Sequence, residues 1–94
     1  MEEAQKAAAL EKKALGNDSF KAGNFEEAIA FFTEGIELDQ SNPNFFCNRA
    51  MANFSLMKWN LAGSDAHRAI MLSDKYVKAY FWLVKAHVHI FYVS

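Results

Sequence analysis

The chain has 94 residues, which is enough for one small domain. Hydrophobic residues make up 52% of it and charged residues 22%, so the composition excludes a disordered segment and favours a buried core. The formal net charge is -1, and this balance argues against binding to nucleic acid or to an anionic membrane surface. The single cysteine, Cys47, cannot form an internal disulfide and fits a reducing compartment.

No segment of the sequence is typical of secretion or membrane insertion. Residues 1–6 are acidic and mixed, without the apolar stretch of a signal peptide. The most apolar window, residues 80–93, is shorter than a membrane span and contains Lys85 and two histidines. These features predict a soluble protein located in the cytoplasm.

Apolar side chains recur at helical spacing and predict five helices. The predicted helices span residues 4–22, 25–39, 43–57, 59–72 and 77–91. In the second of them the apolar residues share one face: Phe25, Ala28, Ile29, Phe32 and Ile36. Only residues 88–93 have a β-like composition. Because every connection is short, successive helices are expected to form antiparallel hairpins.

Three polar positions are predicted to start helices. Asn24 with Glu27 three residues later is close to a capping box, in which each side chain satisfies a backbone N–H at the helix start. Asn42 precedes Pro43, which suits a cap followed by proline at the first helical position. Asp74 is expected to cap the last helix.

The sequence repeats itself at a lag of 34 residues, which indicates a repeat architecture. Identical residues pair at this lag as Phe20 with Phe54, Ala28 with Ala62, Ile36 with Ile70, and Leu38 with Leu72. Similar residues pair in the same register as Gly16 with Ala50, Phe25 with Trp59, Gly35 with Ala69, and Phe46 with Tyr80. The small residues are expected to let helices approach, and large ones to fill the space between hairpins: Phe25, Phe32, Phe46, Trp59 and Tyr80. Since one hairpin cannot bury its own apolar face, successive hairpins are expected to stack.

These residues resemble a known repeat family. The first set resembles one tetratricopeptide repeat: Leu15-Gly16-Asn17, residues 20–25, Ala28-Ile29, Gly35-Ile36 and Leu38-Asp39. The second set resembles another such repeat: Asn48-Arg49-Ala50, Phe54, Trp59, Ala62, Ala69-Ile70 and Leu72. Residues 77–80 resemble the start of a third. The resemblance implies an all-α fold, a right-handed α-α superhelix of about two and a half repeats. It divides a single domain, residues 1–94, into repeats at about 9–42, 43–76 and 77–94.

In such a stack the first helix of each hairpin lines the concave face. The expected inward positions carry only positive formal charge: Lys13, Asn17, Phe20, Lys21, Asn48, Met51, Phe54, Ser55, Lys78 and Lys85. The acids fall on the second helices or their ends: Glu26, Glu27, Glu34, Glu37, Asp39 and Asp65. The small net charge is therefore expected to hide a basic groove, which would raise the local concentration of anions.

Four of these positions resemble the carboxylate clamp of co-chaperone tetratricopeptide domains, which bind heat-shock chaperone tails ending in Glu-Glu-Val-Asp. The matching residues are Lys13, Asn17, Asn48 and Lys78, and the clamp arginine falls on Trp82, with Lys85 one turn further on. The resemblance implies that the lysines and asparagines donate to peptide carboxylates. Apolar contacts to the penultimate valine are expected from Phe20, Met51 and Phe54.

The sequence thus predicts a protein-binding, co-chaperone-like adaptor for acidic C-terminal peptides, and not an enzyme. Two alternatives stay open. One is an assembly scaffold that does not use a clamp, in which the same lysines and asparagines are ordinary surface residues. The other is the targeting domain of a larger enzyme, such as a serine/threonine phosphatase or a peptidyl-prolyl isomerase.

No cofactor or metal is expected. His87 and His89 point in divergent directions on a helix, and neither they nor His67 have neighbouring cysteine or paired carboxylate ligands in the sequence. Beyond residue 84 the pattern of the third repeat is lost, so the last helix would leave an apolar face uncovered: Leu83, Val84, Val88, Ile90, Phe91, Tyr92 and Val93. This face suggests self-association, exchange of the last helix between copies, or truncation of a longer parent.

Overall fold

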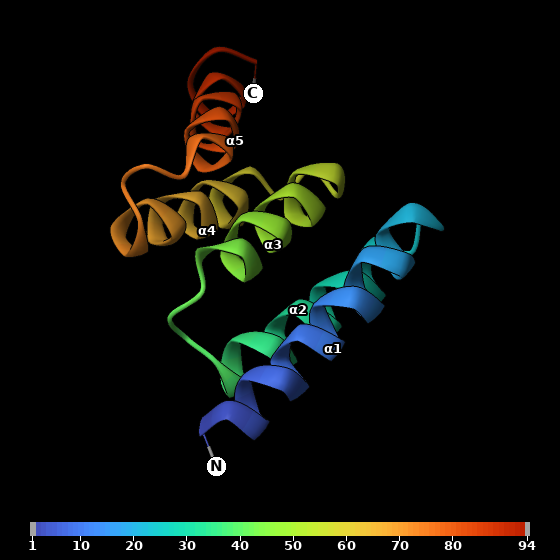
Figure 1. The fold of residues 1–94 in the computed structure, drawn as a ribbon. Coiled ribbons are helices and arrows are strands. Elements are labelled where there is room, and N and C mark those ends of the chain that lie inside the picture. Colours follow the sequence, from blue (N-terminus) through green and yellow to red (C-terminus); the bar gives the residue numbers. More distant parts are fainter. Residues whose placement is uncertain (1, 94) are drawn as a thin grey trace.

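A computed structural model describes residues 2–93, and in this range every regular element is helical. The elements are α1 (Glu2–Lys21), α2 (Phe25–Leu38), α3 (Pro43–Ser55), α4 (Trp59–Leu72), α5 (Val77–Val88) and the π-helical turn η1 (His89–Val93). Figure 1 shows α1 beside α2 and α3 beside α4, with α5 following on α4. The predicted all-α hairpin fold is confirmed.

Of the three predicted caps, Asn42 is confirmed, Asn24 has the predicted position without the capping hydrogen bonds, and Asp74 is wrong. Asn42 does cap α3, since its side chain accepts a hydrogen bond from the Asn44 backbone N–H at 2.9 Å. Asn24 does precede the first residue of α2, but its side chain makes no cap hydrogen bond. Its backbone N–H donates to the Ser19 carbonyl at 2.8 Å, and the Glu27 carboxylate accepts from the Ser19 hydroxyl at 2.9 Å. Asp74 lies before the start of α5, and only its backbone carbonyl is used, as an acceptor for the Tyr80 hydroxyl.

The turns within the two hairpins have the same backbone geometry. Gly23, between α1 and α2, has a φ of 84°, and Met57, 34 residues later, has a φ of 61°. Positive φ suits glycine and is unfavourable for other L-residues. The α3 helix ends at Ser55, before the predicted residue 57, because the left-handed turn at Met57 stops it.

The last helix also differs from the prediction. The α-helix ends at Val88, and residues 89–93 continue as a π-helical turn instead of an α-helix reaching residue 91. At the junction the His89 ring stacks on Trp59, with centroids 4.1 Å apart and planes at 21°, and meets the Phe54 ring edge-on at 5.1 Å. These contacts between α5–η1 and the preceding hairpin accompany the change in winding.

Small and large residues pack as the repeat pattern predicted, with one exception. Gly16 is buried against the Phe32 ring, and an added Cβ at this glycine would lie only 2.5 Å from that ring. Ala28 and Ala62 are also completely buried. Tyr80 is the exception: it is 43% exposed, because its hydroxyl reaches the Asp74 carbonyl at the surface instead of filling a gap between hairpins.

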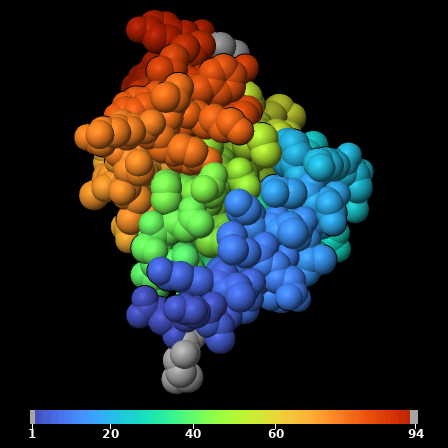
Figure 2. Space-filling model, viewed as in Figure 1, coloured from blue at the N-terminus to red at the C-terminus, as the bar shows by residue number. Residues whose placement is uncertain are grey.

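The stack has an inner and an outer side. Helix α3 contacts both α1 and α5, whereas α2 and α4 make no close backbone contact within the described chain. The first helices of the hairpins therefore converge and the second helices diverge. Figure 2 shows the surface of α1 (blue) meeting that of α3 (green), with orange side chains of the C-terminal half above them. No helix in residues 2–93 has the length and apolar character needed to cross a membrane.

Candidate peptide-binding groove

The two candidate asparagines meet across neighbouring helices. Asn48 on α3 donates a side-chain hydrogen bond from Nδ2 to Oδ1 of Asn17 on α1, at 3.2 Å. Both side chains are half-buried, and Lys13 lies one helical turn before Asn17 and is half-buried as well. Three of the predicted binding residues thus come together where α1 and α3 converge. We call this inner surface of α1, α3 and α5 the concave groove.

Lys78 acts on the same region from α5. It is exposed, and its ammonium group interacts electrostatically with the thiol of Cys47, the residue next to Asn48. Burial raises the pKa of Cys47, and the Lys78 ammonium partly opposes that rise. The Cys47 side chain is 2% exposed and belongs to a core cluster with Phe46, Ala69 and Ala79. Cys47 therefore supports the groove from within the core.

An aromatic cluster lies where α3, α4 and the α5–η1 segment meet. The Phe54 ring lies 4.8 Å from Trp59, 5.4 Å from Trp82 and 5.1 Å from His89, measured between centroids. The Lys85 ammonium lies 5.3 Å from the centre of the Phe54 ring, within the range of a cation–π contact. It also lies 5.2 Å from that of Phe81. Lys85 is therefore held over aromatic faces.

Trp82, at the position where the clamp arginine was expected, is a packing residue. Its half-buried side chain packs against the core cluster that contains Phe46 and Cys47 and also meets Phe54. An indole has one N–H donor and no positive charge, so it cannot form the bidentate pair that arginine forms with a carboxylate. The α5 end of the groove therefore offers an aromatic surface beside Lys78.

The other two apolar candidates, Phe20 and Met51, are both half-buried. Phe20 packs against the core cluster of Ala28, Phe32 and Ala52, and its ring lies 5.0 Å from that of Phe25. Met51 is half-buried on α3, and its carbonyl accepts a hydrogen bond from the Ser55 hydroxyl. Phe20 is thus shared between the core and the surface.

A polar network between α3 and α4 was not predicted from the sequence. Arg49 donates to both carboxylate oxygens of Asp65, at 2.9 and 2.8 Å, and to the Thr33 hydroxyl at 3.1 Å. Asn53 also donates to Asp65, at 3.0 Å. A signal was present in the repeat register, where Arg49 and Asp65 correspond to Leu15 and Phe31. The second repeat thus has two oppositely charged residues where the first repeat has two apolar ones.

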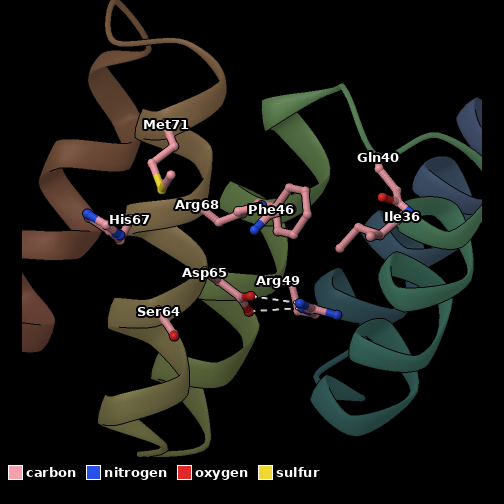
Figure 3. A pocket seen from close by; sticks show the side chains of 9 residues that line it. All are labelled: Ile36, Gln40, Phe46, Arg49, Ser64, Asp65, His67, Arg68 and Met71. Carbon is pink, nitrogen blue, oxygen red and sulfur yellow. Dashed lines mark hydrogen bonds and ion pairs between the residues drawn. The ribbon is translucent and has the colours of Figure 1, made fainter.

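This network borders a cavity on the outer side of the stack (Figure 3). The cavity has a volume of about 440 Å³ and lies between α2 and α4, and Figure 3 shows Arg68 pointing toward Phe46 within it. None of the predicted peptide-binding residues lines it. The cavity therefore belongs to a surface separate from the concave groove.

The histidines do not come together. His89 is stacked on Trp59, with its buried Nδ1 lacking a hydrogen-bond partner, and His87 lies against the Phe91 ring at 5.5 Å. His67 lines the outer cavity. Over residues 2–93 no group of three or more His, Cys, Asp or Glu side chains is arranged to hold a metal ion.

Comparison with known proteins places these features in a family. A TPR (tetratricopeptide) repeat family profile matches residues 16–56. RNA polymerase II-associated protein 3 of Rattus norvegicus is 46% identical over 78 residues, which cover 83% of this chain and 12% of that protein. Mitochondrial import receptor subunit TOM70 of Homo sapiens is 44% identical over 80 residues, covering 80% of this chain and 13% of that protein. The chain thus spans about an eighth of the length of these two relatives.

Among solved structures, the second TPR of Spaghetti (RPAP3), bound to the HSP90 peptide SRMEEVD, superposes with a TM-score of 0.90 at 38% identity. The match covers 94% of this chain and 83% of that one. Likeness in both sequence and fold, over most of both chains, shows that this chain belongs to the tetratricopeptide repeat family.

Proposed function

We propose that this chain is a protein-binding adaptor module that holds the acidic C-terminal peptide of a heat-shock chaperone in the concave groove. In this proposal Lys13, Asn17 and Asn48 bind the terminal carboxylates, and Lys78 binds a further one. The observation that carries the proposal is the direct Asn17–Asn48 hydrogen bond between α1 and α3. It leaves the second Nδ2 proton of Asn48 and the Nδ2 group of Asn17 free to donate to a ligand.

The Spaghetti structure supports this peptide class, because that TPR is bound to an HSP90 peptide that ends in the sequence EEVD. A charge-assisted hydrogen bond contributes roughly 1.5–3 kcal/mol. Two carboxylates held in this way correspond to an affinity on the order of micromolar after ordering costs. Because Trp82 removes one cation, we expect weaker binding than a complete clamp would give.

The decisive experiment compares two peptides by calorimetric titration: SRMEEVD with a free C-terminus, and the same peptide with an amidated C-terminus. The clamp requires the free carboxylate, so amidation is expected to abolish binding. Equal binding of both peptides would overturn the clamp and favour a scaffold that recognises other features of a partner.

Three variants assign the binding to individual residues. Lys13→Glu and Asn48→Ala are each expected to weaken binding by at least about tenfold, because each removes a donor and Lys13→Glu adds repulsion. Trp82→Arg is expected to strengthen it by supplying the missing bidentate donor. Lys75→Glu is the control, because it makes the same change in charge at an exposed position between α4 and α5. It should leave the affinity within about twofold.

The remaining assignments follow from this role. We propose that the module consists of repeats at about residues 9–42 and 43–76 with a partial repeat at 77–94, that it works in the cytoplasm, and that it binds and does not catalyse. Any catalytic activity of a longer protein that contained it would lie outside these residues. Separate expression of residues 1–76, followed by circular dichroism, tests whether the first two repeats fold without the third.

The exposed face of α5 and η1 supports a second property, association between copies. Val84, Phe91 and Tyr92 are 61%, 70% and 85% exposed, and a cluster of exposed apolar side chains is typical of an interaction surface. Light scattering over a range of concentrations tests this. A monomer at every concentration would remove it without affecting the peptide proposal.

A further inference from the structure

A groove runs along the outer side of the molecule, where α2 and α4 diverge over α3. Two cavities of about 440 and 380 Å³ share Arg49, Ser64 and Asp65 in their linings, so they are two halves of one depression. Its apolar walls are Ile29 and Ile36 on the α2 side and Leu61 and Met71 on the α4 side. We call this depression the convex groove.

The convex groove carries an unneutralised positive charge at each end. In its middle Arg49 is neutralised by Asp65, at 2.8 Å. Lys58 lines one half and Arg68 the other, and neither forms an ion pair with any residue of the described chain. The Arg68 guanidinium lies over the Phe46 ring, 5.8 Å from its centre (Figure 3), which orients it while leaving its charge uncompensated.

Comparison of the two repeats shows that this surface is specific to the second one. Helix α2 carries four glutamates and no basic residue. At the positions 34 residues later α4 carries a different set: Glu26, Glu27, Glu34 and Glu37 correspond to Asn60, Leu61, Arg68 and Met71. Leu61 and Met71 are 55% and 69% exposed. Every acid of α2 is therefore replaced at the matching position of α4 by a neutral, apolar or cationic side chain.

We propose that the convex groove binds an extended acidic segment of a partner protein, with apolar side chains between two acidic ends. Lys58 and Arg68 are separated by about 15 Å along the helix axis, at 1.5 Å per residue. An extended chain covers this distance in about five residues, at roughly 3.3 Å each. The acidic ends pair with Lys58 and Arg68, and the intervening side chains contact Leu61 and Met71.

The test uses the full chain and the peptide acetyl-Glu-Glu-Leu-Ser-Leu-Glu-Glu-amide, which has no free terminus and so cannot use the clamp. The control peptide has Gln in place of every Glu. Fluorescence anisotropy should show binding of the acidic peptide, with affinity falling steeply as salt is added, and no binding of the control.

Arg68→Glu places on α4 the residue that the first repeat carries, and it should weaken this binding by at least about tenfold. Lys58→Gln removes the other charge more gently and should weaken it as well. Lys13→Glu should leave it unchanged, which separates this proposal from the concave groove. Circular dichroism confirms that each variant is folded.

Two results would overturn the proposal. One is an affinity for the acidic peptide that Arg68→Glu and Lys58→Gln leave unaltered. The other is an absence of binding to the acidic peptide. If that absence comes with self-association that Arg68→Glu abolishes, the groove is assigned to the acidic α2 face of a second copy of this chain.

Discussion

The two hairpins share a register but hold their helices together by different means. In the first, α1 and α2 interlock as Phe32 fills the space over Gly16, and a larger side chain at Gly16 would collide with that ring. In the second, the matching positions are Ala50 and Ala66, both buried without an aromatic ring between them, and Arg49 and Asp65 connect α3 to α4 instead. The same backbone arrangement is thus stabilised by shape in one repeat and by a nearly buried ion pair in the other.

This difference has consequences for the outer surface. The ion pair engages the one acidic residue of α4. Arg68 on the same helix therefore has no carboxylate partner within α4. In the first hairpin an acid of α2 is used at the surface, where Glu34 pairs with Lys12 at 2.8 Å. The Glu34 carboxylate accordingly raises the pKa of Lys12. The way in which the two helices of each repeat pack therefore decides which charged side chains remain available to bind another protein.

The largest expected effect comes from breaking the ion pair. Asp65→Ala leaves Arg49 and Asn53 without their acceptor, and we expect a loss of about 3–5 kcal/mol in the free energy of unfolding. Urea denaturation followed by circular dichroism measures it. The exposed acid Asp74 is the control, since Asp74→Ala should stay within about 0.5 kcal/mol. Equal effects at both positions would mean that the second hairpin does not depend on its ion pair.

The interlock of the first hairpin gives the next largest effect. In Gly16→Ala the new Cβ would lie 2.5 Å from the Phe32 ring, which is completely buried. We expect a loss of about 1–3 kcal/mol. At Gly63 an added Cβ would meet Ala86 at an ordinary 3.5 Å. Gly63→Ala should therefore be neutral or stabilising by up to about 1 kcal/mol, as helix propensity dictates. Destabilisation of similar size at both glycines would refute the interlock.

A smaller effect is expected at the two turns. Gly23→Ala forces a Cβ into a left-handed conformation and should cost about 1 kcal/mol. Met57 already occupies this conformation and is 71% exposed, so Met57→Gly removes little packing. It should be neutral or stabilising by up to about 1 kcal/mol. Thermal unfolding of the two variants, measured side by side, compares the turns directly. A cost at Met57 equal to that at Gly23 would show that the Met57 side chain stabilises its turn.

The smallest effect concerns pH. Burial raises the pKa of the Cys47 thiol above its ordinary value of 9.0 and that of the Tyr76 hydroxyl above 10.0. Between the unfolded and folded pKa of each group the folded chain binds more protons than the unfolded chain, so stability should fall as the pH rises above about 9. Urea midpoints at about pH 7 and about pH 10 measure this fall, and Cys47→Ala should make it shallower. A Cys47→Ala variant with an unchanged pH dependence would assign the fall to other groups.

The same comparison shows why some features were predictable and others were not. The hairpins, the 34-residue register and the Asn42 cap depend on residues close in sequence, and each was read correctly. Asn24 precedes α2 as predicted, but its capping box does not form: Ser19 on the preceding helix accepts from the Asn24 backbone N–H and donates its hydroxyl to Glu27. The Arg49–Asp65 pair was missed because its members lie on different helices. The 34-residue register does show that this charged pair stands where the first repeat has Leu15 and Phe31. Helical periodicity alone, however, treats the two charged residues as polar surface positions.

The sequence by itself determined the helical periodicity, the repeat and the four lysine and asparagine positions that match the clamp, since all of these follow from spacing along one chain. Only the tertiary structure decided which side chains meet: that Asn48 donates to Asn17, that Trp82 packs on Phe54, and that Arg68 stays unpaired while Arg49 does not. The physical reason is that periodicity fixes the face on which a residue lies. Its partner depends on how neighbouring helices converge or diverge, and that is settled by packing between residues far apart in the sequence.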